Sequence, residues 1–128
     1  MADLQSALFS RVSAAIGSTQ VYWGTAPQGK APPYVRMNTV SDPRPQHLGG
    51  YNGARTTRIQ VDVFAKTYAE ARSLSEMIIA AVAQPATVSG VKFGRTKAEG
   101  PRDRGEDVDG VGYVHWLSTD LLAEHSLA

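Results

Sequence analysis

The stretch from residue 55 to residue 82 constrains the fold most, because a strand pattern changes there within a few residues into a helix pattern. In residues 55–65, apolar and polar side chains alternate, as they do in a half-buried strand. The apolar phase consists of Ile59, Val61 and Val63, and the polar phase consists of Arg58, Gln60 and Asp62. The alternation therefore predicts a strand over residues 55–65 with one face in the core.

A helix is predicted directly after this strand. Thr67 and Glu70 have the T-x-x-E spacing of a capping box, which satisfies backbone N–H groups at a helix start. Apolar side chains then recur at helical spacing over residues 68–82, as Leu74, Ile78, Ala81 and Val82. The whole stretch predicts a sheet strand and a helix that folds back on it.

The length of 128 residues favours one domain spanning residues 1–128. The 13 Lys and Arg residues are opposed by 12 Asp and Glu residues, which argues against a protein whose whole surface binds nucleic acid. The absence of cysteine excludes disulfides and thiolate metal sites. No apolar run approaches the ~20 residues of a membrane-spanning helix, so no membrane association is expected. The first residues lack the basic segment of a signal peptide, so we expect synthesis in the cytosol.

The other periodic segments complete a predicted α+β fold. Residues 3–16 are predicted to form a helix, with Asp3 as N-cap and Gly17 just beyond its end. Further strands are predicted at residues 21–23, 34–40, 91–97 and 112–122. Strand 112–122 carries bulky groups on both faces, so it should be central, and residues 123–128 should fray. The result is a mostly antiparallel sheet of four to five strands, with strands 34–40 and 55–65 paired, two helices packed on one face, and long extended arms.

The extended arms are two polar, Gly-rich segments, residues 41–54 and 98–111. The first contains Asn52 and Gly53, a strong turn signal. The second mixes arginines with several carboxylates. Connections this long in so small a domain are usually functional or disordered, so the arms are candidate contact segments.

Residues 24–30, GTAPQGK, match the G-x-x-x-x-G-K pattern of a phosphate loop, but the residues that follow exclude it. Ala31 stands where a hydroxyl should hold magnesium. Pro32 and Pro33 cannot open a helix with free N–H groups directed at a phosphate. The segment is interpreted as a surface turn, and a small nucleotide-binding or enzymatic domain is a remote alternative.

No pattern indicates catalysis, a cofactor or a metal site. His47, His115 and His125 lack the i+3 or i+4 partner of a helical metal site, so His115 is interpreted as a satisfied sheet histidine and the other two as solvated. No G-x-S-x-G motif is present, and the acidic cluster at 103–109 lacks the spacing of a calcium loop.

Basic side chains concentrate around the first arm. From residue 30 to residue 58, five basic residues face one acidic residue, Asp42, a local excess of +4. They are Lys30, Arg36, Arg44, Arg55 and Arg58. Tyr51 is the one aromatic residue of the arm, so there is no series of rings on which bases could stack. The excess indicates either a docking surface for an acidic partner or the lining of a channel for DNA.

Several segments resemble the tail terminator (tail completion) family of long-tailed phages and of phage-like gene transfer agents. They are the opening LQSALFSRVSAAI, the VYW and PPYVRM segments, RIQVDVFA, YAEARSLSEMII and the closing YVHWLSTDL. The resemblance implies a ring, commonly a hexamer, that caps the head-proximal end of the tail tube and stops its polymerisation. It also implies contacts with the tube protein and the head–tail connector, a place in the virion neck, assembly in the host cytoplasm, passage of DNA through the lumen, and no cofactor.

With this resemblance, the arms become candidate subunit or tube contacts, through Arg44, Gln46, His47, Tyr51, Asn52, Arg102, Arg104 and Asp107. The basic patch becomes a candidate lumen or docking surface, through Lys30, Arg36, Arg55 and Arg58. A head–tail connector or stopper protein of the same neck is the alternative within this class.

Overall fold

The computed structural model describes residues 4–17, 19–25, 33–41, 55–108 and 112–127. These residues form two helices and six strands. In chain order they are α1 (Leu4–Ile16), β1 (Gln20–Trp23), β2 (Tyr34–Ser41), β3 (Arg55–Ala65), α2 (Tyr68–Ala83), β4 (Ala86–Val88), β5 (Val91–Val108) and β6 (Gly112–Leu127).

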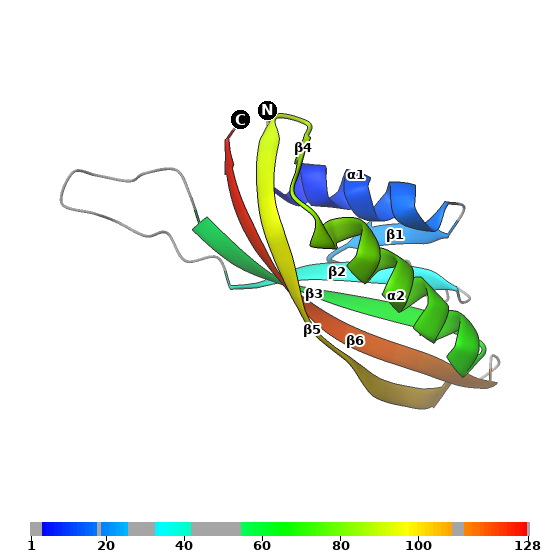
Figure 1. Cartoon of the computed structure of the whole chain (residues 1–128). Helices are drawn as coiled ribbons and strands as arrows, with labels where there is room; N and C mark the ends of the chain where they lie inside the picture. The colour runs from blue at the N-terminus through cyan, green and yellow to red at the C-terminus, as the bar shows by residue number, and fades with distance from the viewer. Residues whose placement is uncertain (1–3, 18, 26–32, 42–54, 109–111, 128) are drawn as a thin grey trace.

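The strands form one mixed sheet of six, in the order β1-β2-β3-β6-β5-β4, and both helices lie on one of its faces (Figure 1). The α+β class, the helix layer and the antiparallel pairing of β2 with β3 are confirmed. The expected number of four to five strands was too low, because β4 was missed. β4 has three residues and turns into β5 through Ser89 and Gly90, which both have positive φ. β1 and β2 are parallel, which was also not predicted.

The prediction of an arm at residues 98–111 was wrong for residues 98–108, which belong to β5. They pair with β6 from Ala98 opposite Leu121 to Val108 opposite Gly112. This part of the hairpin carries charged side chains on both faces, so it lacks the apolar alternation that identifies a strand in sequence. Its register shifts at Gly100, where φ is 122° and an added Cβ would lie 2.9 Å from the Ser118 carbonyl oxygen. Residues 42–54 and 109–111 lie outside the described residues.

The expectation that residues 123–128 fray was also wrong, because β6 continues to Leu127. Ala123 and His125 are buried, and His125 is not solvated as expected. Its Nε2 lies 2.7 Å from the Thr57 hydroxyl on β3. β6 lies between β3 and β5, so its predicted central position is confirmed.

The core fills the space between the helices and one face of the sheet. Its largest fully buried side chains are Phe93, Leu4, Leu8, Met37, Ile59, Ile78, Leu117 and Leu121. Arg11 on α1 joins the two helices, because its guanidinium donates at 2.9 Å to the carbonyls of Ala81 and Gln84 at the end of α2. It also lies 5.0 Å from the ring centre of Phe93. Burial lowers the pKa of Arg11.

Two of the three helix ends predicted from sequence have the expected geometry, and the third, the N-cap at Asp3, lies outside the described residues. Gly17, directly after α1, has a φ of 61°, as a C-terminal glycine should. Thr67 caps α2, and its hydroxyl accepts from the Glu70 N–H at 3.2 Å. Within the described ranges, neither helix is long and apolar enough to cross a membrane.

Replacing the cap of α2 tests this local assignment. Thr67→Ala should lower the free energy of unfolding by about 1 kcal/mol, because the Glu70 N–H loses its acceptor. Urea denaturation measures the change. Thr67→Ser keeps a hydroxyl and should retain most of the stability, whereas equal losses in both variants would contradict the capping role.

Candidate assembly surface

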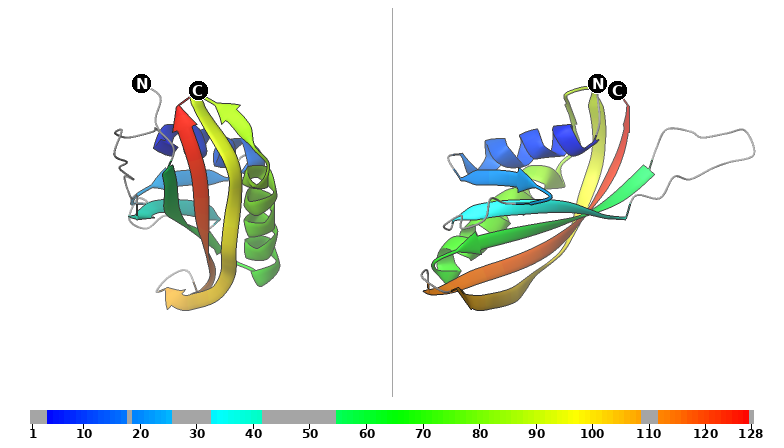
Figure 2. Two further views of the ribbon diagram at one scale, coloured as in Figure 1. Left: turned by 60° about the vertical axis from the view of Figure 1, so that its left-hand side comes forward. Right: turned by 180° about the vertical axis from the view of Figure 1, so that it is seen from behind.

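The sheet face opposite the helices is here called the open face. It carries the side chains that alternate with the core residues along the strands. Within the described part of the chain, neither helix covers it (Figures 1 and 2). The strand registers place on it Tyr34 and Arg36 of β2, Arg58, Gln60, Asp62 and Phe64 of β3, Trp116, Ser118 and Asp120 of β6, and Glu99, Arg102 and Arg104 of β5. The open face therefore combines residues that are far apart in the sequence.

Three arginines and three carboxylates form ion pairs across four strands of this face. Arg36 on β2 donates to Asp62 at 3.0 Å, and the Asp62 carboxylate also accepts from Gln60 at 3.0 Å. The side chain of Asp62 is fully buried by its neighbours, with 0% exposure. A charge buried to this degree needs such partners, because an unpaired one is costly.

The second part of the network centres on Asp120 of β6. Arg58 donates to it at 2.7 Å and Arg102 at 3.1 Å, one from each neighbouring strand. Arg58 also reaches Glu99 at 3.3 Å. Asp120 thereby links β3, β6 and β5 on the open face.

The pKa of Asp120 reflects this position. Partial burial raises its pKa, but the hydrogen bonds and charges of Arg58 and Arg102 outweigh burial, so the pKa lies below its ordinary value of 3.8. The hydrogen bonds to Asp120 and Glu99 raise the pKa of Arg58. Both partners are therefore held in their charged forms.

The ion pairs make the net charge of the predicted basic patch smaller than the sequence indicates. The excess of +4 counted along residues 30–58 omits carboxylates supplied by β3, β5 and β6. In the network, Arg36, Arg58 and Arg102 are matched by Asp62, Glu99 and Asp120. Arg104 adds one positive charge with no carboxylate within ion-pair distance among the described residues. The open face is thus close to neutral, with a mild cationic edge.

A row of aromatic side chains runs across the same face at one end of the network. Tyr34 stacks on Phe64 with ring centres 4.6 Å apart, and Phe64 stacks on Trp116 at 5.1 Å. Tyr22 of β1 meets Tyr34 edge-on at 6.1 Å. Arg104 lies 5.4 Å from the ring centre of Trp116. The aromatic row therefore spans β1, β2, β3 and β6, and β5 contributes Arg104 beside it.

This aromatic row does not have the form of a base-stacking platform. Such a platform presents free ring faces to successive bases. Here the faces of Phe64 are occupied by Tyr34 and Trp116, and Arg36 and Arg104 lie over the Trp116 ring. The row instead presents the half-buried rings of Tyr22, Tyr34 and Trp116 beside arginines, a composition enriched at protein interfaces.

The structure brings together part of the predicted site. Arg36, Arg58, Arg102 and Arg104, predicted in two separate groups, share the open face. Arg55, opposite His125, lies in the strand phase that faces the helices. Asp107 is paired with Tyr113 in the β5–β6 hairpin. Lys30, Arg44, Gln46, His47, Tyr51 and Asn52 lie outside the described residues, so their assigned roles stay predictions.

Sequence reasoning missed the carboxylates and aromatics of this face. Asp62, Phe64, Trp116 and Asp120 lie in the recognised strands 55–65 and 112–122, but their partners follow only from the register between strands. Arg58, Asp62 and Phe64 occupy the same phase of the strand alternation, and this was the available signal in the sequence. Among the described residues, no three His, Asp or Glu side chains form a group that could hold a metal ion.

Removing one partner of the buried ion pair should destabilise the fold. Arg36→Leu should lower the free energy of unfolding by about 2–3 kcal/mol, because Asp62 keeps Gln60 as its donor and loses its counter-charge. The 31% exposure of the Arg36 side chain keeps the expected loss below that of a fully buried pair. The double variant Arg36→Leu/Asp62→Leu should recover most of the stability. A single variant as stable as wild type in urea would contradict the assignment.

Acid sensitivity tests the role of Asp120. Because its folded-state pKa lies below its ordinary value, ionised Asp120 stabilises the fold at neutral pH, and this contribution is lost as the pH falls through the folded-state pKa. Between about pH 5 and about pH 2, wild type should lose stability more steeply than Asp120→Asn. Urea denaturation at a series of pH values measures both slopes. Asp103→Asn, which removes a carboxylate bound by Tyr68, is the control and should keep the wild-type slope.

Comparison with known proteins identifies the family. The family model described as tail completion protein gp17 matches residues 3–116. No curated protein sequence matches significantly. The fold is similar to that of a chain in the virion of a native gene transfer agent particle, with a TM-score of 0.57 and 17% identity, over 97% of this chain and 93% of that chain. The chain therefore belongs to the tail completion protein gp17 family and is a structural assembly protein of phage tails, as its sequence resemblance implied.

Proposed function

We propose that copies of this chain form a ring, a hexamer, that caps the head-proximal end of the tail tube. The ring stops polymerisation of the tube protein and presents its other side to the head–tail connector in the virion neck. The family match over residues 3–116 is the observation that carries this proposal. The likeness to a chain of a gene transfer agent virion supports a fold suited to such particles.

The open face supports contact with other protein chains. It combines a buried carboxylate, a row of aromatic rings and exposed arginines, and neither described helix covers it. Contacts between different surfaces of neighbouring copies generate a closed ring when the rotation closes. Such a ring would also use the first arm, residues 41–54, through the side chains predicted from sequence.

The charge balance supports a lumen through which DNA passes without being held. Each uncompensated cation that meets a phosphate adds to a salt-dependent attraction, and strong attraction would slow transit. Arg36, Arg58 and Arg102 are neutralised by Asp62, Asp120 and Glu99, and Arg104 adds one charge that no described carboxylate matches. Any part of the open face that neighbouring copies leave uncovered therefore attracts DNA mildly, as a conduit requires. The proposed function includes no cofactor and no chemical step.

Two alternatives make different predictions. A connector or stopper protein would leave tail length normal and block the joining of tails to heads. A small nucleotide-binding protein would bind ATP in a manner that depends on Lys30, within the GTAPQGK segment, of which residues 26–30 lie outside the described residues.

The proposed function can be tested by assembling tails with and without the protein. With wild type, electron microscopy should show tails of uniform length ending in a ring, and without it the tubes should vary in length. Deleting residues 44–52 should leave a protomer with wild-type circular dichroism that fails to cap tails. Uniform tails in the absence of the protein would contradict capping, and normal tails with the deletion variant would exclude the first arm.

A further inference from the structure

The outer edge of β1 is available for another strand. β1 ends the sheet, and within the described ranges no strand pairs with its outer side. The Gly24 N–H donates to the Met37 carbonyl of β2 at 2.8 Å. Because successive residues of a strand direct their backbone groups to opposite sides, the N–H and C=O groups of Val21 and Trp23 point away from β2. They form a short row of donors and acceptors suited to strand addition.

The other edge of the sheet is built differently. β4 covers only the first residues of β5, from Val91 to Phe93. Beyond them, β5 carries Pro101, two register shifts and six charged side chains before residue 105: Arg95, Lys97, Glu99, Arg102, Asp103 and Arg104. Charges, proline and bulges are the means by which exposed edges avoid pairing with other strands. The sequence of β1, QVYW, contains none of them.

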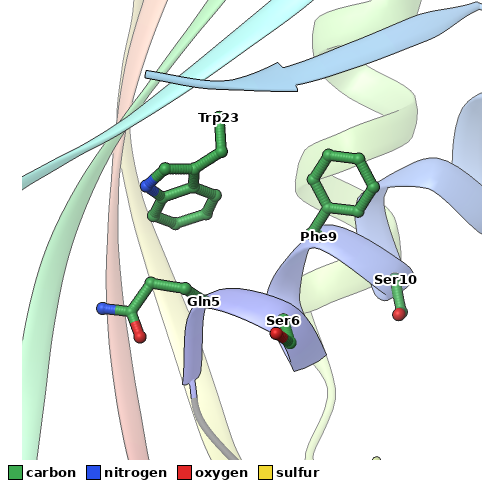
Figure 3. Close-up of a pocket in the computed structure, with 5 residues that line it drawn as sticks. All are labelled: Gln5, Ser6, Phe9, Ser10 and Trp23. Carbon is green, nitrogen blue, oxygen red and sulfur yellow. The ribbon is translucent and has the colours of Figure 1, made fainter.

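A shallow pocket of about 340 Å³ lies beside this edge, between α1 and β1 (Figure 3). Gln5, Ser6, Phe9 and Ser10 of α1 line one side, and Trp23 of β1 lines the other. Phe9 and Trp23 are half-buried, and no charged side chain lines the pocket. A pocket near the low end of the roughly 300–1,000 Å³ of ligand sites suits one or two bulky side chains.

The pocket and the edge form a continuous site. Trp23 lines the pocket with its ring and offers its outward backbone groups to an added strand. An extended chain beside β1 would direct every second side chain to the helix side of the sheet, where Trp23 lies. One of these side chains would then meet Phe9 and Trp23.

We propose that β1 and α1 form a docking groove for an extended, uncharged segment of another protein, which adds as a strand beside β1 and inserts one bulky apolar side chain between Phe9 and Trp23. The uncharged lining of the pocket selects this occupant, because an ionised side chain there would lose water without gaining a partner. The charged β5 edge of a second copy does not match it. The assignment rests on the proposed function, in which the partner is the tail tube subunit.

The test compares two arginine substitutions on α1. Ser10→Arg places a charged side chain at the exposed rim of the pocket. Ala14→Arg introduces the same side chain at an exposed position of α1, one turn further along and outside the pocket lining. It is the matched control. Each full-length variant, with its fold checked by circular dichroism, is co-sedimented with purified tail tubes.

Ser10→Arg should bind tubes about ten- to a hundredfold more weakly than Ala14→Arg, the loss expected when one bulky apolar side chain is no longer buried. In wild type, tube binding should slow hydrogen exchange of the Val21 and Trp23 amides. Equal binding of both variants, or slowed exchange confined to other strands, would overturn the groove and leave the capping function in place.

Two further outcomes would also decide against the groove as proposed. If hydrogen exchange of the β1 amides slows as the protein concentration rises in the absence of tubes, the occupant is a second copy. Wild type that does not bind tubes at all would contradict the capping function, and the groove assignment with it.

Discussion

The pairing of β3 with β6 determines which side chains face the hydrophobic core and which face the open side of the sheet. The two strands match without interruption from Arg55 opposite His125 to Ala65 opposite His115. This register puts Val61 and Leu121 among the buried side chains and keeps Asp120 on the open face. Because side chains alternate along a strand, a shift by one residue would exchange the two sets. The hydrophobic core and the assembly surface are therefore fixed by the same hydrogen bonds.

The parts of the fold that could be predicted from sequence are those with a local periodic signal. α1, β3 and α2 each bury one phase of a regular pattern, and α2 has a recognisable cap. The outer half of the β5–β6 hairpin has no such phase, because Arg102, Asp103 and Arg104 in consecutive positions are all exposed. β4 and the last residues of β6 are strands because of their neighbours, as the burial of His125 beside Thr57 shows. Tertiary contacts of this kind leave no local trace.

Only part of the candidate surface could be predicted from the sequence. The arginines stand out in the sequence, but their net effect depends on carboxylates that arrive from other strands. Arg58 is separated from Asp120 by 62 positions and from Glu99 by 41, so counting charges along a window overstates the local field. The same holds for the rings, since Tyr34, Phe64 and Trp116 become neighbours only when three strands are in register. A long-range surface becomes visible only once strand order is known.

The order of strands has a consequence for how the chain is made. β3 can pair with β2 as soon as both have left the ribosome, but its second edge waits for β6, which follows α2, β4 and β5 in the chain. Contacts between such distant segments form slowly, because a long loop must close before any of them is gained. Until then, β3 exposes an apolar phase and an open row of backbone groups, the features through which nascent chains aggregate. The yield of folded protein in the host should therefore depend on how soon β6 is synthesised after β3.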